Sequence, residues 1–186
     1  MDHQQGIIMK VKLAILAFLV TGGISSTAFA EDGKINFTGN IIEQGCDVSS
    51  TVSSPLVVKL GDVAKTAFNG SGTTAANTRF TLALTNCPDA LKNKPVVVKY
   101  DGTPDSNNRD YLQLTGYGSA GVASGVAIQL LNASGTPLPL ATDSESQTIS
   151  AAGDAKLDFS ARYIATEAAV SAGTANSTVN FTLAYN

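Results

Sequence analysis

Short segments with the residue pattern of β-strands run through the chain from residue 34 to its end. In the closing segment, 177–186, apolar Val179, Phe181, Leu183 and Tyr185 alternate with polar or small residues, as in a strand with one buried face. Seven further segments, rich in β-branched and aromatic residues, predict strands at 34–42, 54–60, 79–87, 94–100, 111–114, 126–132 and 156–165. Turn-forming residues separate these segments, and helical periodicity is weak. The pattern predicts an all-β, immunoglobulin-like antiparallel β-sandwich in one domain.

The first 30 residues have the pattern of a secretory signal. Lys10 and Lys12 precede an apolar run at 13–20, and small residues follow up to Ala30. This predicts a signal peptide over 1–30 that is removed after Ala30, with Met9 as an alternative start, because the run is too short to span a membrane. The removed segment holds two of the twelve Lys and Arg and one of the fifteen Asp and Glu, so the exported part carries a formal charge of −4. That balance provides no basic surface for nucleic acid.

Both cysteines of the chain, Cys46 and Cys87, lie in the exported part. A single pair in an oxidising compartment predicts one disulfide bond. The alternative, a metal site, lacks the histidines that would complete it. Because the chain has no Trp, it also lacks the Cys…Trp…Cys pattern of antibody domains, and we expect a different branch of the sandwich architecture.

Catalysis by the common side-chain chemistries is not expected. The one histidine, His3, lies in the removed segment, so the exported part has no general base that titrates near neutral pH. Asp101, Asp105 and Asp110 suggest a calcium loop, but their spacing departs from the twelve-residue loop signature and the residues around them are typical of turns. The sequence therefore predicts no enzyme, no metal and no cofactor.

Three stretches of the exported part are informative together. They are DGKINFTGNIIEQGCDV at its start, GVAIQLLNASGTPL in the middle, and FSARYIATEAAVSAGTANSTVNFTLAYN at the end. These stretches resemble the pilins of type 1-like chaperone–usher fimbriae. The last stretch has Tyr185 as the penultimate residue and Gly173 fourteenth from the end, as in the C-termini that pilus chaperones recognise. The resemblance covers nearly all of the exported part and keeps the order of signal, extension, two cysteines and C-terminal strand.

The resemblance implies a sandwich that lacks its last strand and is completed by a donor strand from a neighbouring subunit. The domain organisation would be a donor extension at 31–42 that runs into the first strand, followed by a pilin domain at 43–186. The residues that would enter a neighbour's groove are Gly33, Ile35, Phe37, Gly39 and Ile41. Those that would form the acceptor groove and bind a chaperone are Gly173, Val179, Phe181, Leu183 and Tyr185. The alternative for 34–42 is the first strand of the domain itself.

The resemblance further implies a structural subunit of an adhesive filament. Its partners would be copies of itself, a periplasmic chaperone, an outer-membrane usher and tip adhesin or adaptor subunits, and its route would lead through the periplasm to the cell surface. A major, shaft-forming subunit is favoured. Only Glu31 and Asp32 precede Gly33 after cleavage, which keeps a minor adaptor or tip subunit as an alternative. The sequence is also compatible with a glycan-binding adhesin domain or with a self-sufficient secreted binding domain.

Overall fold

The computed structural model describes residues 34–186, which divide into two parts, 34–40 and 41–186. All strands and helical turns of the described chain lie in the second part. Residues 34–42 are exposed and belong to no helix or strand, so the strand expected there is wrong for the isolated subunit. A strand is defined by its ladder of hydrogen bonds, and no other described segment pairs with this one. The signal segment and Gly33 lie outside the described residues.

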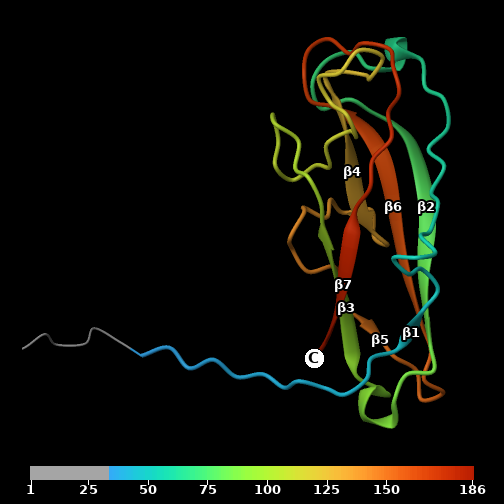
Figure 1. The fold of residues 1–186 in the computed structure, drawn as a ribbon, viewed down its shortest axis with the longest axis vertical. Coiled ribbons are helices and arrows are strands. Elements are labelled where there is room, and N and C mark those ends of the chain that lie inside the picture. The colour runs from blue at the N-terminus through green and yellow to red at the C-terminus, as the bar shows by residue number, and fades with distance from the viewer. Residues whose placement is uncertain (1–33) are drawn as a thin grey trace, which may run out of the picture. The chain divides into compact units, whose positions relative to one another are not determined.

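Two antiparallel sheets form the fold (Figure 1). The first has the order β1-β2-β6-β4 and consists of β1 (Asp47–Val48), β2 (Thr74–Thr85), β6 (Ala155–Ala165) and β4 (Val126–Asn132). The second has the order β5-β3-β7 and consists of β5 (Gln147–Thr148), β3 (Pro95–Asp101) and β7 (Asn180–Tyr185). One hydrophobic core contains buried residues of both sheets, which is the sandwich architecture that the sequence predicts.

Most expected strands are present. Strand β4 coincides with the segment 126–132, and β2, β3, β6 and β7 overlap the segments 79–87, 94–100, 156–165 and 177–186. Two short 3₁₀ turns, η1 (Lys65–Ala67) and η2 (Asp89–Leu91), have no counterpart in the sequence prediction. Neither of these turns, the helical segments found in 34–186, is long and apolar enough to cross a membrane.

The strand expected at 54–60 is also wrong, for a local reason. Pro55 has no N–H to donate, and the N–H of Leu56 is bound by the side chain of Ser50 (2.9 Å). The segment runs past β2 without a ladder, leaving a recess of about 420 Å³ between residues 56–59 and 78–81. It therefore remains extended but unpaired.

The free edge of β4 is covered by other parts of the chain. Leu112 exchanges two backbone hydrogen bonds with Ile128 (2.8 and 3.0 Å), and the N–H of Leu138 bonds to Leu130 O (2.9 Å). These isolated contacts replace the strand expected at 111–114, which is not formed. Every residue of β4 is buried as a result. Because an open edge invites pairing with other chains, this edge is closed to them.

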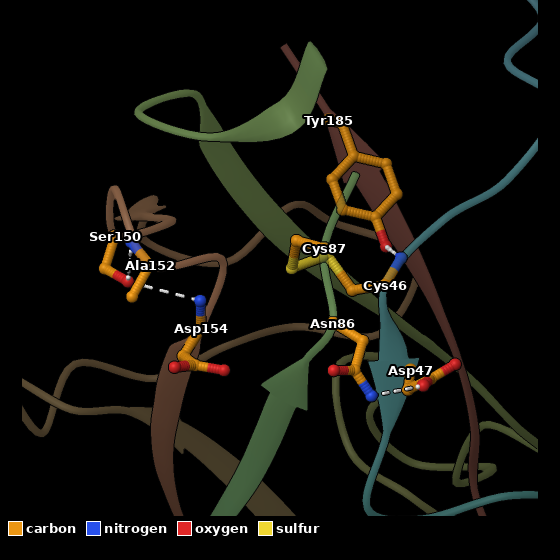
Figure 2. The surroundings of a disulfide bond; sticks show 8 residues. All are labelled: Cys46, Asp47, Asn86, Cys87, Ser150, Ala152, Asp154 and Tyr185. Atoms are coloured by element: carbon orange, nitrogen blue, oxygen red, sulfur yellow. Dashed lines mark hydrogen bonds between the residues drawn. A yellow bond between two sulfur atoms is a disulfide. The ribbon is translucent and has the colours of Figure 1, made fainter. Parts of the chain in front are cut away.

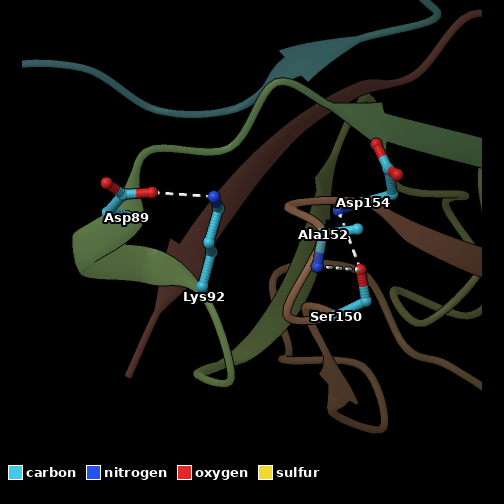
Figure 3. Close-up of polar contacts among 5 residues, drawn as sticks. All are labelled: Asp89, Lys92, Ser150, Ala152 and Asp154. Atoms are coloured by element: carbon cyan, nitrogen blue, oxygen red, sulfur yellow. Dashed lines mark hydrogen bonds and ion pairs between the residues drawn. The ribbon is translucent and has the colours of Figure 1, made fainter.

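A disulfide bond joins Cys46 to Cys87 at one end of the sandwich (S–S 2.03 Å), which confirms the sequence prediction (Figure 2). It links the residue before β1 to the segment after β2. The turn at 150–154 lies beside it, with Ser150 Oγ accepting from the N–H groups of Ala152 and Asp154 (both 3.2 Å; Figure 3). The N–H of Cys87 bonds to Gly153 O (3.0 Å) in this turn. The start of the domain is thus joined to the segment after β2, which in turn bonds to the turn before β6.

Candidate functional site

Strand β7 has one paired edge and one open edge. Its residues pair with β3 from Val96–Tyr185 to Asp101–Asn180, and within the described chain nothing pairs with its other edge. Phe181, Leu183 and Tyr185 are half-buried against the core, whereas the residues between them are exposed. The alternation read from the sequence therefore describes this strand correctly, and its outer row of backbone groups is available to a further strand.

A groove of about 1040 Å³ opens beside β7. One wall is the unpaired segment 55–63, and the other is the segment 170–179 that leads into β7. The floor is apolar and draws on both sheets and the loops between them; it includes Phe80, Leu82, Tyr100, Leu112, Ile128 and Phe181. A cleft with an apolar floor, beside a strand with one open edge, has the properties needed to receive an extended, amphipathic chain.

Close backbone packing positions the wall at 170–179. A Cβ atom on Gly173 would lie 2.5 Å from the carbonyl carbon of Val122 and 2.8 Å from Gly121 O, so no other residue fits without moving the main chain. Beside it, the N–H of Thr174 bonds to Gly121 O (2.8 Å) and the N–H of Ala123 to Thr174 O (3.0 Å). Gly173, which was expected to form part of the acceptor groove, lies in this wall; its close contact with the loop at 121–123 was not indicated by the sequence.

Two side-chain hydrogen bonds also hold the wall at 170–179 in position. The hydroxyl of Tyr163, on β6, donates to Ala175 O (3.1 Å), and that of Ser177 donates to Gln113 O (2.6 Å). Partial burial, and secondarily the negative charge of Asp62 in the opposite wall, raise the pKa of Tyr163, so its hydroxyl stays protonated well above neutral pH. The wall beside β7 is thus held in place before any partner arrives.

An aromatic cluster surrounds Tyr100, which lines the floor together with Phe80 and Phe181. The ring of Tyr100 packs edge-on against Phe159 (centroids 5.4 Å apart) and Phe80 (6.5 Å), and it meets Phe181 at 6.3 Å. The hydroxyl of Tyr100 is buried and has no hydrogen-bond partner in the described chain. Burial raises the pKa of Tyr100, because the charged phenolate would be poorly solvated there. Sequence reasoning missed this residue, since an inward-facing Tyr in a strand looks like ordinary core.

The end of β7 contacts the point where the extension leaves the domain. The N–H of Cys46 donates to the hydroxyl oxygen of Tyr185 (3.1 Å), and Figure 2 shows the ring reaching across to it beside the disulfide. A Cβ on Gly45 would lie 3.0 Å from the same hydroxyl. Tyr185, expected to form the acceptor groove and to bind a chaperone, therefore also contacts the start of the pilin domain at Cys46.

The residues expected to enter a neighbour's groove are exposed. The side chains of Ile35, Phe37 and Ile41 are 78%, 91% and 101% exposed, and a Cβ on Gly39 would meet no atom within 4 Å. Large apolar side chains at such exposure are unfavourable in water unless another surface buries them.

The acidic residues considered for a calcium loop belong to a turn. Asp105 is buried, and its Oδ1 accepts hydrogen bonds from the N–H groups of Asn107 and Asn108.

The sequence profile of the fimbrial protein family matches residues 35–186 of the chain. The chain belongs to this family. The fimbrial subunit is 32% identical over 184 residues to a type-1 fimbrial protein subunit of Serratia marcescens, covering 95% of this chain and 99% of the relative. It is 37% identical over 181 residues to the F17 fimbrial protein of Escherichia coli, covering 94% and 98%. The family resemblance noted in the sequence is thereby confirmed.

Solved structures agree with the fold of the fimbrial subunit. A Burkholderia pseudomallei antigen and type I fimbria protein superposes with a TM-score of 0.57 and 39% identity, over 82% of this chain and 97% of that one. The P pilus rod subunit PapA superposes with a TM-score of 0.62 and 21% identity, over 77% and 100%, and shows the same fold. The fimbrial subunit is a structural protein that assembles with other pilin subunits into a fimbrium at the cell surface.

Proposed function

We propose that the fimbrial subunit polymerises by donor-strand exchange: the extension at 31–42 of one copy enters the groove of the pilin domain, 43–186, of the next. The observation that carries this proposal is the groove itself, which lies between the unpaired segment 55–63 and the chain leading to the open edge of β7. Chaperone–pilin complexes are a known example of such strand addition.

The same chain offers a matching occupant. Residues 33–41 in extended form span about 30 Å, longer than the roughly 20 Å of the six-residue β7. Ile35, Phe37 and Ile41 would face the floor, while Gly33 and Gly39 let the donor backbone approach it. Burial of each large side chain is worth about 1.5–3 kcal/mol. The backbone of the donor would bond to β7 beside Val179, Phe181, Leu183 and Tyr185.

Such a contact is heterologous, because the surface that donates differs from the surface that accepts. A head-to-tail contact of this kind does not close and produces an open filament. Before polymerisation, we propose, a periplasmic chaperone occupies the same groove and delivers the subunit to an outer-membrane usher, so that the open edge is never exposed to aggregation. Because the chain carries both a groove and an extension, it can occupy internal positions, and we assign it to the filament shaft.

The test is a chain in which the donor is fused to its own acceptor. A copy of DGKINFTGNII placed after Asn186 through a short flexible linker should produce a stable monomer with a raised melting temperature that no longer polymerises. The matched control carries Phe37→Asp in the fused copy only, which would bury an unpaired charge and should abolish the stabilisation. A fused donor that does not raise the melting temperature above that of this control contradicts the proposal.

A deletion tests the donor separately. Removing residues 31–38 leaves all groove residues in place, so the deleted subunit should still receive the donor peptide but should not donate to a neighbour. Mixed with wild-type subunits, it should terminate filaments, and length distributions by electron microscopy measure this. Filaments built from the deleted subunit alone would refute the assignment of the donor.

A further inference from the structure

The segment 57–63 lies between two openings and has no strand beside it. Its first half adjoins the recess of about 420 Å³ next to β2, and all of its residues line the groove of about 1040 Å³ (Figure 1). None of its backbone N–H or C=O groups takes part in a hydrogen bond within residues 34–186. Seven consecutive residues therefore have a main chain without a partner on either side.

The side chains of this segment alternate between the core and the outside. Val58 and Leu60 are half-buried, and Leu60 packs against the hydrophobic core, whereas Val57 is 73% exposed and Lys59 is exposed. This alternation is that of an extended chain. Within the described chain, side-chain packing rather than backbone bonding holds the segment against the domain, so it can detach without breaking a ladder.

Another exposed basic residue, Arg109, lies on backbone that is bonded. In its loop, 105–111, the N–H of Asp105 bonds to Tyr111 O (2.9 Å), and Oδ1 of Asp105 accepts from two further N–H groups of the loop. Opening this loop would break these bonds. Exposure of a side chain therefore does not distinguish the segment 57–63 from the rest of the surface, whereas its lack of backbone bonds does.

We propose that the segment 57–63 is the site at which an endopeptidase that binds its substrate as an extended strand cuts the subunit while its groove is empty. Binding of this kind pairs with the backbone of the bound segment and places alternate side chains in pockets. The segment offers free backbone groups together with outward-facing Val57 and Lys59. This inference rests on the proposed donor-strand exchange and goes beyond it in assigning a cleavage site to one wall of the groove.

An enzyme that recognises a basic side chain would cut between Lys59 and Leu60. Water adds to the carbonyl carbon of Lys59, the C–N bond breaks, and the nitrogen of Leu60 leaves as a free amine. The fragment that ends at Lys59 contains Cys46, so the disulfide bond to Cys87 keeps it attached to the rest of the domain. A cut subunit would therefore retain its extension but have a severed groove wall.

An occupied groove should protect the segment from cleavage. A strand seated in the groove would pack against the wall that 57–63 forms, so detaching the segment would also expose apolar side chains of the occupant. Burial of one large apolar side chain changes the equilibrium for opening by a factor of about 10 or more. Cleavage that proceeds through the opened form follows its population, so we expect it to slow by about the same factor.

Trypsin digestion of the exported chain, 31–186, tests the site, with fragments identified by mass spectrometry. The chain carries Lys34→Gln, which removes the trypsin site in the exposed extension. Within the pilin domain, the first cut should follow Lys59 rather than Arg109, and the two fragments should separate only on reducing gels. Lys59→Gln should abolish this cut, whereas the matched control, Arg109→Gln, should leave its rate unchanged.

A donor peptide tests the dependence on occupancy. A peptide of residues 31–42, also with Lys34→Gln, should slow the cut at Lys59 by about 10-fold or more, and the rise in melting temperature reports its binding separately. If the first cut in the free pilin domain lies elsewhere, or if bound peptide leaves the rate at Lys59 unchanged, the inference is wrong while donor-strand exchange stands. If the peptide neither binds nor protects, both are wrong.

Discussion

Gly173→Ala should displace the groove wall while leaving the two sheets formed. The added methyl would overlap backbone atoms of the loop at 121–123, at 2.5 Å from the carbonyl carbon of Val122 and 2.8 Å from Gly121 O. These atoms belong to the main chain and cannot rotate away as a side chain could. The segment must therefore separate from the loop.

The magnitude follows from what the separation breaks. Two backbone hydrogen bonds join Thr174 to this loop, and each contributes about 0.5–1.5 kcal/mol. Overpacking that forces a backbone shift adds about 1–3 kcal/mol. The expected loss is therefore about 2–6 kcal/mol, comparable to a large part of the stability of an ordinary domain.

Urea unfolding of the chain with the fused donor measures this loss, and binding of the free donor peptide measures the damage to the groove. Thr174→Ala is the matched control: it keeps the backbone and removes only a weak hydroxyl contact to Gly121 O (3.3 Å), so it should cost less than about 1 kcal/mol. If Gly173→Ala unfolds and binds peptide like this control, then the wall is not fixed by close backbone approach and the reasoning fails.

Three further predictions concern the ends of the sandwich and its aromatic floor. Thiol labelling of the unreduced, denatured protein should find no free cysteine, and Cys87→Ser should cost about 2–5 kcal/mol in urea unfolding; stoichiometric labelling would refute the bond. Tyr185→Phe removes the acceptor of the Cys46 N–H, so it should lower the free energy of unfolding by about 0.5–1.5 kcal/mol and speed hydrogen exchange at that N–H. Unchanged exchange would show that this contact is not formed in solution. The raised pKa of Tyr100 means that the folded state favours the neutral phenol, so stability present below pH about 10 should fall as the pH rises further. Melting temperatures of Tyr100→Phe should fall less over that range, and parallel curves would exclude Tyr100 as the cause.

The order of residue types along the chain was sufficient to predict strands that follow a simple pattern of buried and exposed side chains. The segment 126–132 is apolar throughout most of its length and is a strand buried on both faces, and the alternation in 177–186 correctly places Phe181 inward. The pairing of Cys46 with Cys87 followed from their number and the signal segment. These features depend on the period of side chains along a strand and on the chemistry of the compartment, and both can be read one residue after another.

Pattern failed where a strand depends on its partner. Segments 34–42 and 54–60 have the composition of strands, yet neither has a ladder in the isolated subunit, because hydrogen bonds to a neighbour make a strand and no neighbour is present. The pattern could not indicate that these two segments would be left unpaired while the edge of β4 would be covered by Leu112 and Leu138.

The sequence by itself determined the β-sandwich, the disulfide and the family, because each depends on residue types and their order along the chain. Only the tertiary structure decided which edge stays open, that Gly173 supports the groove wall, that Tyr185 reaches Cys46, and that the Tyr100 hydroxyl is left without a partner in the described chain. Each of these joins atoms from residues distant in the sequence, or leaves one atom unmatched among them. Such contacts depend on how side chains pack in three dimensions, and the residue pattern along one strand does not specify that packing.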